Sequence, residues 1–381
     1  MRILHTSDWH LGRQFHGVAL EEDHDHALVQ ILSIIDDQQP DVLIVAGDIF
    51  DRANPPQSAL KRLSEFLTTV RATSSAAIVL IAGNHDSAAQ IGALGVLATD
   101  GEAIVRGPLD ENEKPLIISD AAGPVAISAL PFAFEYAARL CFDDEEIACP
   151  GDVIRAQLAS ARKHVTDGMR WIVVAHAFVD GAATSESERP LMRMVGGIET
   201  VSAAAFDGAH YVALGHLHRP QSVGLNHVRY SGAPLAFGFD EEGQEKSVSL
   251  IELAHDGTVE VTEFSIKPLR QVRTIRGRLL ELLAATEVSN DLVRVVLTDE
   301  APQIDPMKRI RALYPNAVQL AYERNERPIA QRLEEQRAAI DDPHALASTF
   351  LEIVRGDPLS EAEAGIVAHA LNAFATTEVG Q

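Results

Sequence analysis

The sequence predicts an α/β layered fold, in which buried apolar strands alternate with helices. The clearest signal is the run Val-Leu-Ile-Val-Ala at residues 42–46, which is typical of a strand buried on both faces. Four more apolar runs begin at Ile3, Ala77, Trp171 and Tyr211. Between the first three runs, the apolar residues of segments 21–37 and 57–73 have helical spacing. We therefore expect one α/β domain over residues 1–267.

The later elements of this domain are predicted from the same periodicities. Helices are expected over residues 88–97 and 153–164. Strands are expected at Val125–Leu130, Val228–Tyr230, Ser247–Leu253 and Val259–Phe264. The last two are joined at Asp256-Gly257, a dipeptide typical of a hairpin. The polar segment 180–193 is expected to be a surface loop.

From about Pro268 the pattern changes to a small module whose strand ends do not show the metal-ligand pattern of the first domain. Residues 268–324 alternate as βαβαβ, and the tail, residues 325–381, is predicted to be helical with a break at Gly356-Asp357-Pro358. Two apolar stripes flank the break: Leu346, Phe350, Leu351 and Val354, and then Ile366, Val367, Leu371 and Phe374. These stripes dock either on a partner or on the chain's own core.

Composition limits the classes of function that fit the chain. Its 381 residues carry a net charge of −23, whereas nucleic-acid-binding proteins are usually basic. A nucleic-acid function therefore needs metals, a local basic surface or a partner. Cys141 and Cys149 are expected to be reduced thiols. No apolar run has the length of a membrane span and no signal-peptide region is seen, so a cytoplasmic location is expected.

Polar residues follow each apolar run at the point where the strand is expected to end. They are Asp8, His10, Asp48, Asn84, His176, His216 and His218. A lone aspartate there is usually a turn or cap residue, and a lone histidine is usually a surface or core residue. However, open α/β sheets bind their ligands at the carboxyl ends of the strands. Seven side chains that can coordinate a metal, at the ends of five strands, therefore predict a metal site.

The seven residues divide between two metals. A site for two cations about 3.5–4 Å apart needs a bridging ligand, for which the Asp48 carboxylate is the candidate. One set is Asp8, His10, Asp48 and His218, and the other is Asp48, Asn84, His176 and His216. Asp8 and His10 are expected to alternate along an extended segment and so to face one way. A nitrogen and oxygen set without thiolate suits Mn²⁺, with Mg²⁺, Fe²⁺ or Zn²⁺ as alternatives.

Four motifs carry a family resemblance. They are Asp8-Trp9-His10, Gly47-Asp48, Gly83-Asn84-His85-Asp86 and Gly215-His216-Leu217-His218. This set resembles the calcineurin-like metallophosphoesterase superfamily. Within it, the chain is similar to the bacterial SbcD nuclease family at Thr6–Gly12, Leu214–Gln221, Tyr230–Pro234, Phe239–Glu241 and Lys246–Val248. The resemblance implies an αββα layered sandwich with a small βαβαβ capping module and a helical C-terminal tail.

The resemblance also implies a function and partners. It implies a metal-dependent DNA exonuclease and endonuclease acting on DNA ends and hairpins, with the tail bound to the coiled coil of SbcC, a Rad50-type ATPase. The chain itself has no Gly-x-x-x-x-Gly-Lys-Ser/Thr phosphate loop. A nuclease homodimer is implied through the helices at 57–73 and 88–97.

Further site residues are expected beside the ligands. By resemblance, His85 stabilises the phosphoryl oxygens or protonates the leaving oxygen and Asp86 orients it; the alternative is that His85 is a structural residue of its turn. Archaeal and eukaryotic members of the family carry a histidine where this chain has Asp51, so the role of that histidine cannot be assigned to this chain. Asp51 is instead a candidate partner of the metal ligands. Arg13, Arg52 and Arg219 adjoin the ligand segments and are candidate DNA contacts.

Two other classes of function share parts of this pattern. A stand-alone metallophosphatase or cyclic-nucleotide phosphodiesterase would use the same metals, but it would not need the added module and the tail. A DNA-end tethering scaffold with weak nuclease activity would not need the complete ligand set.

Overall fold

The computed structural model describes residues 1–98, 102–188, 192–193, 197–198, 200–284, 287–323, 348, 350–351 and 359–378. The chain forms two compact units. The first comprises Met1–Thr274, Ser289–Arg294 and Asn316–Gln319, and the second comprises Ile275–Val288, Val295–Pro315 and Leu320–Gln381. Of the predicted tail features, Leu346, Val354 and the break at 356–358 lie outside the described residues.

The first unit contains two six-stranded sheets. One has the order β16-β15-β1-β4-β5-β6, with strands β1 (Arg2–Thr6), β4 (Val42–Val45), β5 (Ala77–Ile81), β6 (Ala103–Arg106), β15 (Lys246–Leu253) and β16 (Val259–Ile266). Strands β1, β4, β5 and β6 are parallel, and β15 pairs antiparallel with β1 and β16. The predicted hairpin and the predicted buried strands are confirmed, whereas β6 was not predicted.

The other sheet has the order β13-β14-β12-β9-β8-β7. Its strands are β7 (Leu116–Asp120), β8 (Gly123–Leu130), β9 (Arg170–His176), β12 (Tyr211–Gly215), β13 (Gln221–Val223) and β14 (Leu225–Tyr230). Strands β8, β9, β12 and β14 are parallel, and the two edge strands are antiparallel to their neighbours. Two short ladders also form: β2 (Gln14–Phe15) with β3 (Val18–Ala19), and β10 (Met192–Arg193) with β11 (Gly197–Ile198).

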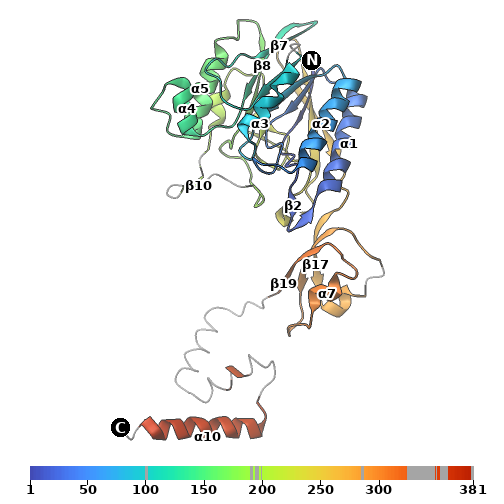
Figure 1. The fold of residues 1–381 in the computed structure, drawn as a ribbon, viewed down its shortest axis with the longest axis vertical. Helices are drawn as coiled ribbons and strands as arrows, with labels where there is room; N and C mark the ends of the chain where they lie inside the picture. Colours follow the sequence, from blue (N-terminus) through green and yellow to red (C-terminus); the bar gives the residue numbers. More distant parts are fainter. Residues whose placement is uncertain are drawn as a thin grey trace. The chain divides into compact units, whose positions relative to one another are not determined.

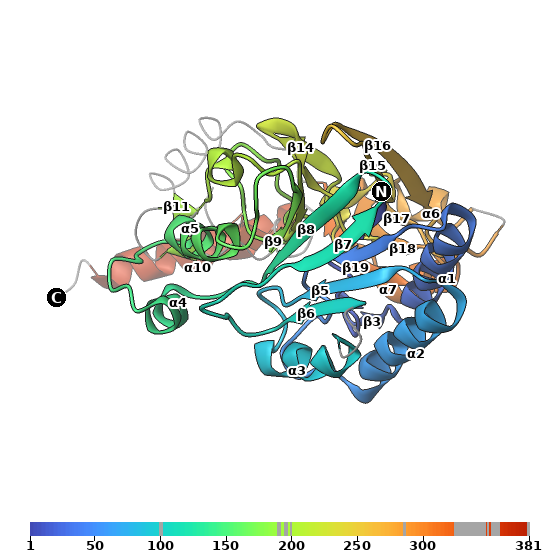
Figure 2. The ribbon, with the colours of Figure 1, turned by 90° about the horizontal axis from the view of Figure 1, so that it is seen from above.

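Alternating side chains pack the sheets into four layers. Along β4, Val42 and Ile44 face a core shared with Ile127 and Val174 of the second sheet. Leu43, which points to the opposite face, packs in a separate core beneath the helices α1 (Glu21–Gln38), α2 (Gln57–Thr73) and α3 (Ala88–Ala93). The helices α4 (Glu135–Phe142) and α5 (Pro150–Arg162) lie on the side of the second sheet (Figures 1 and 2). The expected αββα sandwich is confirmed.

The helices agree with the sequence in type and partly in extent. The bounds of α2 are those predicted, because its apolar stripe is regular and Pro56 precedes it. The expected helix at 88–97 is shorter, since α3 passes into a 3₁₀ helix, η1 (Leu94–Ala98). Helix α4 was not predicted. Among the described residues, no helix is both long and apolar enough to cross a membrane.

The small module has the predicted βαβαβ order. Its elements are β17 (Val272–Gly277), α6 (Leu279–Leu282), β18 (Leu292–Leu297), α7 (Pro306–Ile310) and β19 (Ala317–Tyr322), and the sheet order is β17-β18-β19. Further along, α10 (Glu361–Glu378) is helical as expected, and its Ile366 is 69% exposed. Phe350 is also exposed. The described part of the tail thus presents apolar side chains to solvent.

Candidate metal centre

Strand ends from both sheets meet at one edge of the sandwich. Asp8 and His10 follow β1, Asp48 follows β4 and Asn84 follows β5. From the second sheet, His176 ends β9, and His216 and His218 follow β12. Backbone hydrogen bonds hold the first two segments together: Asp8 N donates to Gly47 O and His10 N to Asp48 O, both at 3.0 Å. All seven predicted ligands are therefore brought together.

The backbone at the ligands is not the extended conformation expected from the sequence. Asp8 has a φ of 54°, His10 of 47°, Asp48 of 47° and His216 of 108°. The expectation that Asp8 and His10 alternate along an extended segment is wrong, because the chain turns at both residues. L-residues in the left-handed region store strain, and such strain concentrates at functional sites.

The first ligand group contains Asp8, His10 and His218. Their candidate ligand atoms all lie within 4.8 Å of one another, and all three side chains are buried. Nε2 of His10 is 3.2 Å from Nε2 of His218. The Asp8 carboxylate accepts hydrogen bonds from Ser7 Oγ at 2.6 Å and from the His216 amide at 3.0 Å, which orients it in the site.

The second ligand group contains Asp48, His176 and His216, again with ligand atoms within 4.8 Å of one another. Oδ1 of Asn84 lies 3.0 Å from both His176 Nε2 and His216 Nδ1. Nδ1 of His176 donates to the Ala46 carbonyl at 2.9 Å, which directs its Nε2 towards the site.

Asp48 belongs to the second group and also lies beside the first. Its Oδ2 lies 3.7 Å from His10 Nε2 and 3.5 Å from His176 Nε2, so one carboxylate oxygen adjoins a ligand of each group. Its Oδ1 accepts the His85 amide at 2.8 Å. This position is the one predicted for a bridging carboxylate.

Two glycines allow the ligand segments to approach one another. Gly47 has a φ of +89°, and a Cβ there would lie 2.5 Å from His176 Nδ1. A Cβ on Gly83 would lie 2.2 Å from Asp48 Oδ1 and 2.3 Å from Asp48 N. The strand ends are so close that a methyl group on either residue would displace a ligand.

A buried polar network supports His218. Its Nδ1 lies 2.8 Å from Ser187 Oγ, which is hydrogen-bonded to Glu241, and Glu241 pairs with Lys246. Because a carboxylate only accepts, Ser187 donates to Glu241 and accepts from His218 Nδ1, leaving His218 Nε2 for the metal. The His218 amide donates to Glu188 Oε1 at 2.7 Å.

This network was missed because it lies partly in the segment expected to be a surface loop. Ser185 and Glu188 are buried, with Glu188 only 5% exposed, so that expectation is wrong for these two residues, whereas Glu186 between them is exposed. The short spacing Ser-Glu-Ser-Glu gives no periodic signal of burial. Glu241 and Lys246, the other two residues of the network, lie in the SbcD-like stretches at 239–241 and 246–248, so the resemblance could have pointed to them.

A third group, His10, Asp51 and His85, lies beside the first two. Nδ1 of His85 donates to the Asp51 carbonyl at 2.8 Å, and its ring centroid is 4.8 Å from that of His10. The Asp51 carboxylate is 3.7 Å from His10 Nδ1, and neither of these two buried atoms has a hydrogen-bond partner among the described residues. Asp51 thus adjoins a ligand, as expected.

Asp86 has a different role from the one expected. Its carboxylate accepts the amides of Ile49 at 3.1 Å, Phe50 at 2.8 Å and Gly83 at 2.9 Å. It therefore fastens the turn after β5 to the turn after β4. The expectation that it orients His85 is wrong, because the hydrogen-bond partner of the His85 ring is the Asp51 carbonyl.

The charges of the pocket fit divalent cations. Burial raises the pKa of Asp8 to about 8, although the charge of His176 opposes this shift. Burial acts in the same direction on Asp48, but the charge and hydrogen bond of His176 together with the charges of His10 and His85 outweigh it and hold the pKa of Asp48 below its usual range. For His176, burial lowers the pKa, yet the Asp48 carboxylate outweighs burial and raises it to about 9. The buried carboxylates thus require positive charge beside them, which two cations would supply.

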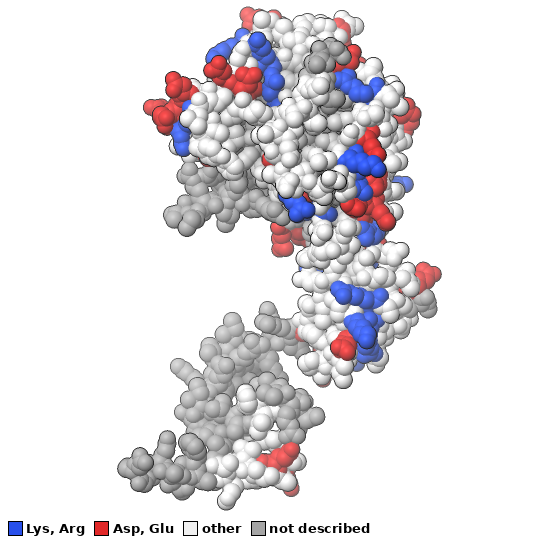
Figure 3. All heavy atoms as spheres, in the orientation of Figure 1, with Lys and Arg blue, Asp and Glu red and all other residues white. Residues whose placement is uncertain are grey.

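The three candidate arginines differ in position. Arg52 and Arg219 are exposed. Arg13 is mostly buried: its Nη2 donates to Ser187 O at 2.9 Å, and its guanidinium lies 4.5 Å from the Phe237 ring centroid. Arg13 is therefore engaged inside the unit, and its side chain is not placed for the expected DNA contact. On the face shown in Figure 3, basic side chains lie next to acidic ones.

The two sheets and the seven candidate ligands at their common edge are those of a metallophosphoesterase. Comparison with known proteins agrees: the family described as Calcineurin-like phosphoesterase matches residues 1–220. Residues 268–355 match SbcD_C, described as Type 5 capsule protein repressor C-terminal domain.

Two relatives match most of the chain, and both are named as the SbcD component of the nuclease SbcCD. The one from Staphylococcus epidermidis is 27% identical over 98% of both chains. The one from Staphylococcus saprophyticus subsp. saprophyticus is 32% identical over 84% of both chains. The chain belongs to the calcineurin-like phosphoesterase family and, within it, to the SbcD nucleases. It is a metal-dependent nuclease, and the small-molecule phosphatase and scaffold interpretations are set aside.

Proposed function

We propose that the chain holds two divalent cations and hydrolyses DNA phosphodiesters at this centre. Asp8, His10, Asp48 and His218 would hold one cation, and Asp48, Asn84, His176 and His216 the other. The observation that carries the proposal is the position of Asp48 Oδ2, within 3.7 Å of one ligand group and 3.5 Å of the other. The absence of cysteine from this set favours Mn²⁺, with Mg²⁺, Fe²⁺ or Zn²⁺ as alternatives.

The protein's own groups orient the reaction. When bound, the cations would polarise the phosphodiester and lower the pKa of the attacking water. His85 is partly exposed beside the ligands, and its Nδ1–H is engaged by the Asp51 carbonyl. Its Nε2 is therefore the ring atom that faces substrate, and a proton carried there is transferred to the leaving oxygen. The hydrogen bond that the His85 amide donates to Asp48 Oδ1 fixes His85 next to the proposed bridging ligand.

We propose that the substrates are DNA ends and hairpins. Arg52 and Arg219 are exposed next to ligand segments, and contacts from them to phosphates would offset part of the chain's negative charge. Arg13 would act indirectly, by holding the Ser187 carbonyl.

We propose SbcC, a Rad50-type ATPase, as the partner of the chain. The relatives' name places them in a complex called SbcCD. The exposed Phe350 and Ile366 support the tail, residues 325–381, as the part that binds the partner's coiled coil. Residues 1–267 would then form the nuclease domain and residues 268–324 the capping module.

We also propose a homodimer through α2 and the α3–η1 segment. Leu63 and Leu67 of α2 line a hollow with Leu94 and Val96 of η1. Leu60 is 43% exposed and Val96 is 71% exposed beside it. A second copy would cover these apolar side chains.

The bridging role is tested with Asp48→Asn. The amide keeps the size of the side chain but removes its charge, so Mn²⁺ bound per chain and cleavage of a hairpin oligonucleotide should both fall strongly. Asp36→Asn, an exposed position in α1, is the matched control and should behave as the wild type. Equal metal content and equal cleavage by Asp48→Asn and the wild type would contradict the assignment.

A further inference from the structure

A row of aromatic rings leads from the metal centre to the surface. Phe132 and Phe134 lie in the segment that joins β8 to α4, and Tyr136 lies in the first turn of α4. The Phe132 ring centroid lies 6.4 Å from that of His176 and 5.1 Å from that of Phe134. The rings of Phe134 and Tyr136 are stacked, with centroids 5.8 Å apart and an interplanar angle of 12°.

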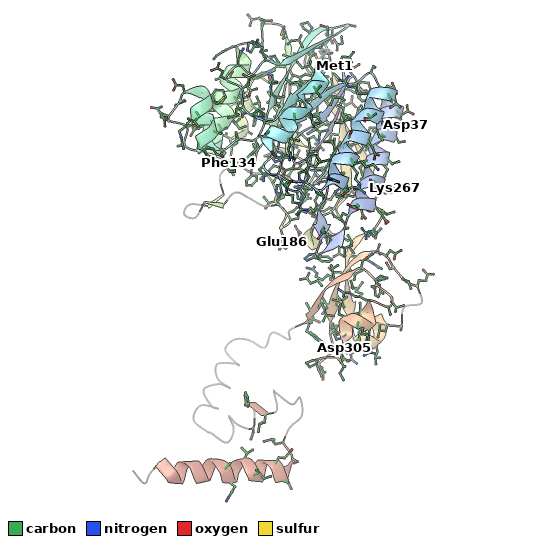
Figure 4. The ribbon with its side chains drawn as sticks, in the orientation of Figure 1. Met1, Asp37, Phe134, Glu186, Lys267 and Asp305 are labelled. Carbon is green, nitrogen blue, oxygen red and sulfur yellow. The ribbon has the colours of Figure 1, made fainter. Side chains whose placement is uncertain are left out.

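The outer part of the row is open to solvent. Phe134 is 44% exposed and Tyr136 is 61% exposed. Figure 4 shows Phe134 at the margin of the first unit, where α4 begins. Leu140, in the next turn of α4, is 82% exposed. These exposed side chains contribute little to the core, and exposed apolar side chains close together are typical of a binding site.

The inner end of the row is continuous with the metal centre. The Phe132 amide donates to the Ala82 carbonyl at 2.9 Å, directly before Gly83 and Asn84. Phe132 also lines a pocket together with the ligands His176 and His216. A fully buried glutamine, Gln157, lines the same pocket, and its Oε1 has no hydrogen-bond donor in the described part of the chain. The pocket can therefore accept an N–H group as well as an aromatic surface.

The charge at the other end of α4 disfavours phosphate. Four exposed acidic residues, Asp143 to Glu146, directly follow α4. A DNA strand that passes here is repelled through its phosphates, so its uncharged bases are the groups that can meet the rings. Bases stack on aromatic side chains largely without regard to sequence, because every base has a π face.

We propose that Phe134 and Tyr136 form a stacking platform for unpaired bases of the DNA strand whose phosphodiester lies at the metal centre. This inference rests on the proposed function. Bases inside a duplex already stack on their neighbours and are not available to the rings. The platform therefore favours unpaired ends and hairpin loops over continuous duplex.

The test compares a normal single-stranded oligonucleotide with one of equal length that carries abasic sites. The values of kcat/KM are measured with Mn²⁺ for the full-length wild type and for the double variant Phe134→Ala, Tyr136→Ala. The wild type should prefer the strand with bases. The double variant should lose about 5- to 100-fold on that strand, mainly through KM, and so lose the preference. Tyr136→Ala alone gives a smaller loss and serves if the double variant does not fold.

Two variants separate stacking from general apolar contact. Tyr136→Phe keeps the ring and should keep the preference. Leu140→Ala removes an exposed apolar side chain from the same helix without removing a ring and should also keep it. An unchanged preference in the double variant would overturn the proposal. An equal loss of preference in Leu140→Ala would also overturn it, and would indicate instead an apolar surface that binds a protein partner. If the wild type cleaves neither strand, the proposed function itself fails.

Discussion

Gly83→Ala tests how closely the ligand segments must pack. The added Cβ would lie 2.2 Å from Asp48 Oδ1, 2.3 Å from Asp48 N and 2.8 Å from Asp48 Cγ. To reach ordinary van der Waals contact, Asp48 or the turn after β5 must move by about 1.2 Å. The turn cannot retreat without breaking the hydrogen bond from the Gly83 amide to Asp86. We therefore expect Asp48 to be displaced.

The size of the effect follows from this displacement. A misplacement of about 1 Å in a catalytic group can cost roughly 100-fold in rate. Overpacking of a well-packed interior costs about 1–3 kcal/mol in free energy of unfolding. The variant should therefore remain folded, with a lower melting temperature, but should lose about two orders of magnitude in kcat and bind less Mn²⁺.

The assay combines three measurements on the same preparation: cleavage of a single-stranded oligonucleotide over a range of Mn²⁺ concentrations, metal content by mass spectrometry and thermal unfolding. Gly365→Ala in α10 is the matched control, because nothing lies within 4 Å of a Cβ added there and the residue is outside both the nuclease domain and the proposed dimer surface. A Gly83→Ala protein with the rate and metal content of the wild type would refute the packing argument.

Three other predictions concern separate parts of the unit. His85→Gln should keep its metals but lose about 10²–10⁴ in rate, because the side chain acts on substrate; metal loss on titration would show that His85 is a ligand instead. The slope of log DNA affinity against log salt concentration should become less steep in the double variant Arg52→Gln, Arg219→Gln, by the amount expected for the loss of about two phosphate contacts. Burial raises the pKa of Glu113 from 4.5 to about 7, although a nearby arginine opposes this shift. The folded protein therefore binds a proton at Glu113 more tightly than the unfolded chain does. The free energy of unfolding that this difference contributes is lost as pH rises from about 4.5 to 7. The free energy of unfolding in urea should therefore increase for Glu113→Gln relative to the wild type, by up to roughly 3 kcal/mol, when the pH is raised from 5 to 8. The same difference between variant and wild type at both pH values would contradict this cause.

The parts of the fold predicted well are those set by local patterns. Buried parallel strands are continuous apolar runs, and the polar residue that ends each run is visible in the sequence. The seven candidate ligands could be placed together from the sequence because each lies at the end of such a run or within a few residues of it. The bounds of α2 could also be predicted, since its stripe is regular and proline marks its start.

The details that failed depend on the backbone and on distant contacts. The left-handed turns at Asp8 and His10 are imposed by hydrogen bonds to Gly47 and Asp48, some forty residues away. The partners of the Asp86 carboxylate likewise include amides that lie 36 and 37 residues away. No periodicity within a segment can reveal such contacts.

The support of His218 shows why the resemblance extends beyond the ligands. Lys246 and Glu241 contribute no ligand, yet both are almost fully buried. Lys246 Nζ donates to the His218 carbonyl at 3.1 Å and pairs with Glu241, whose pKa lies well below its usual range because its bonds to His218 and Lys246 outweigh burial. Removing one member of a buried ion pair leaves the other charge unpaired, which is strongly destabilising. Replacing either residue in this chain should therefore disturb the position of His218, although neither residue would touch a metal itself.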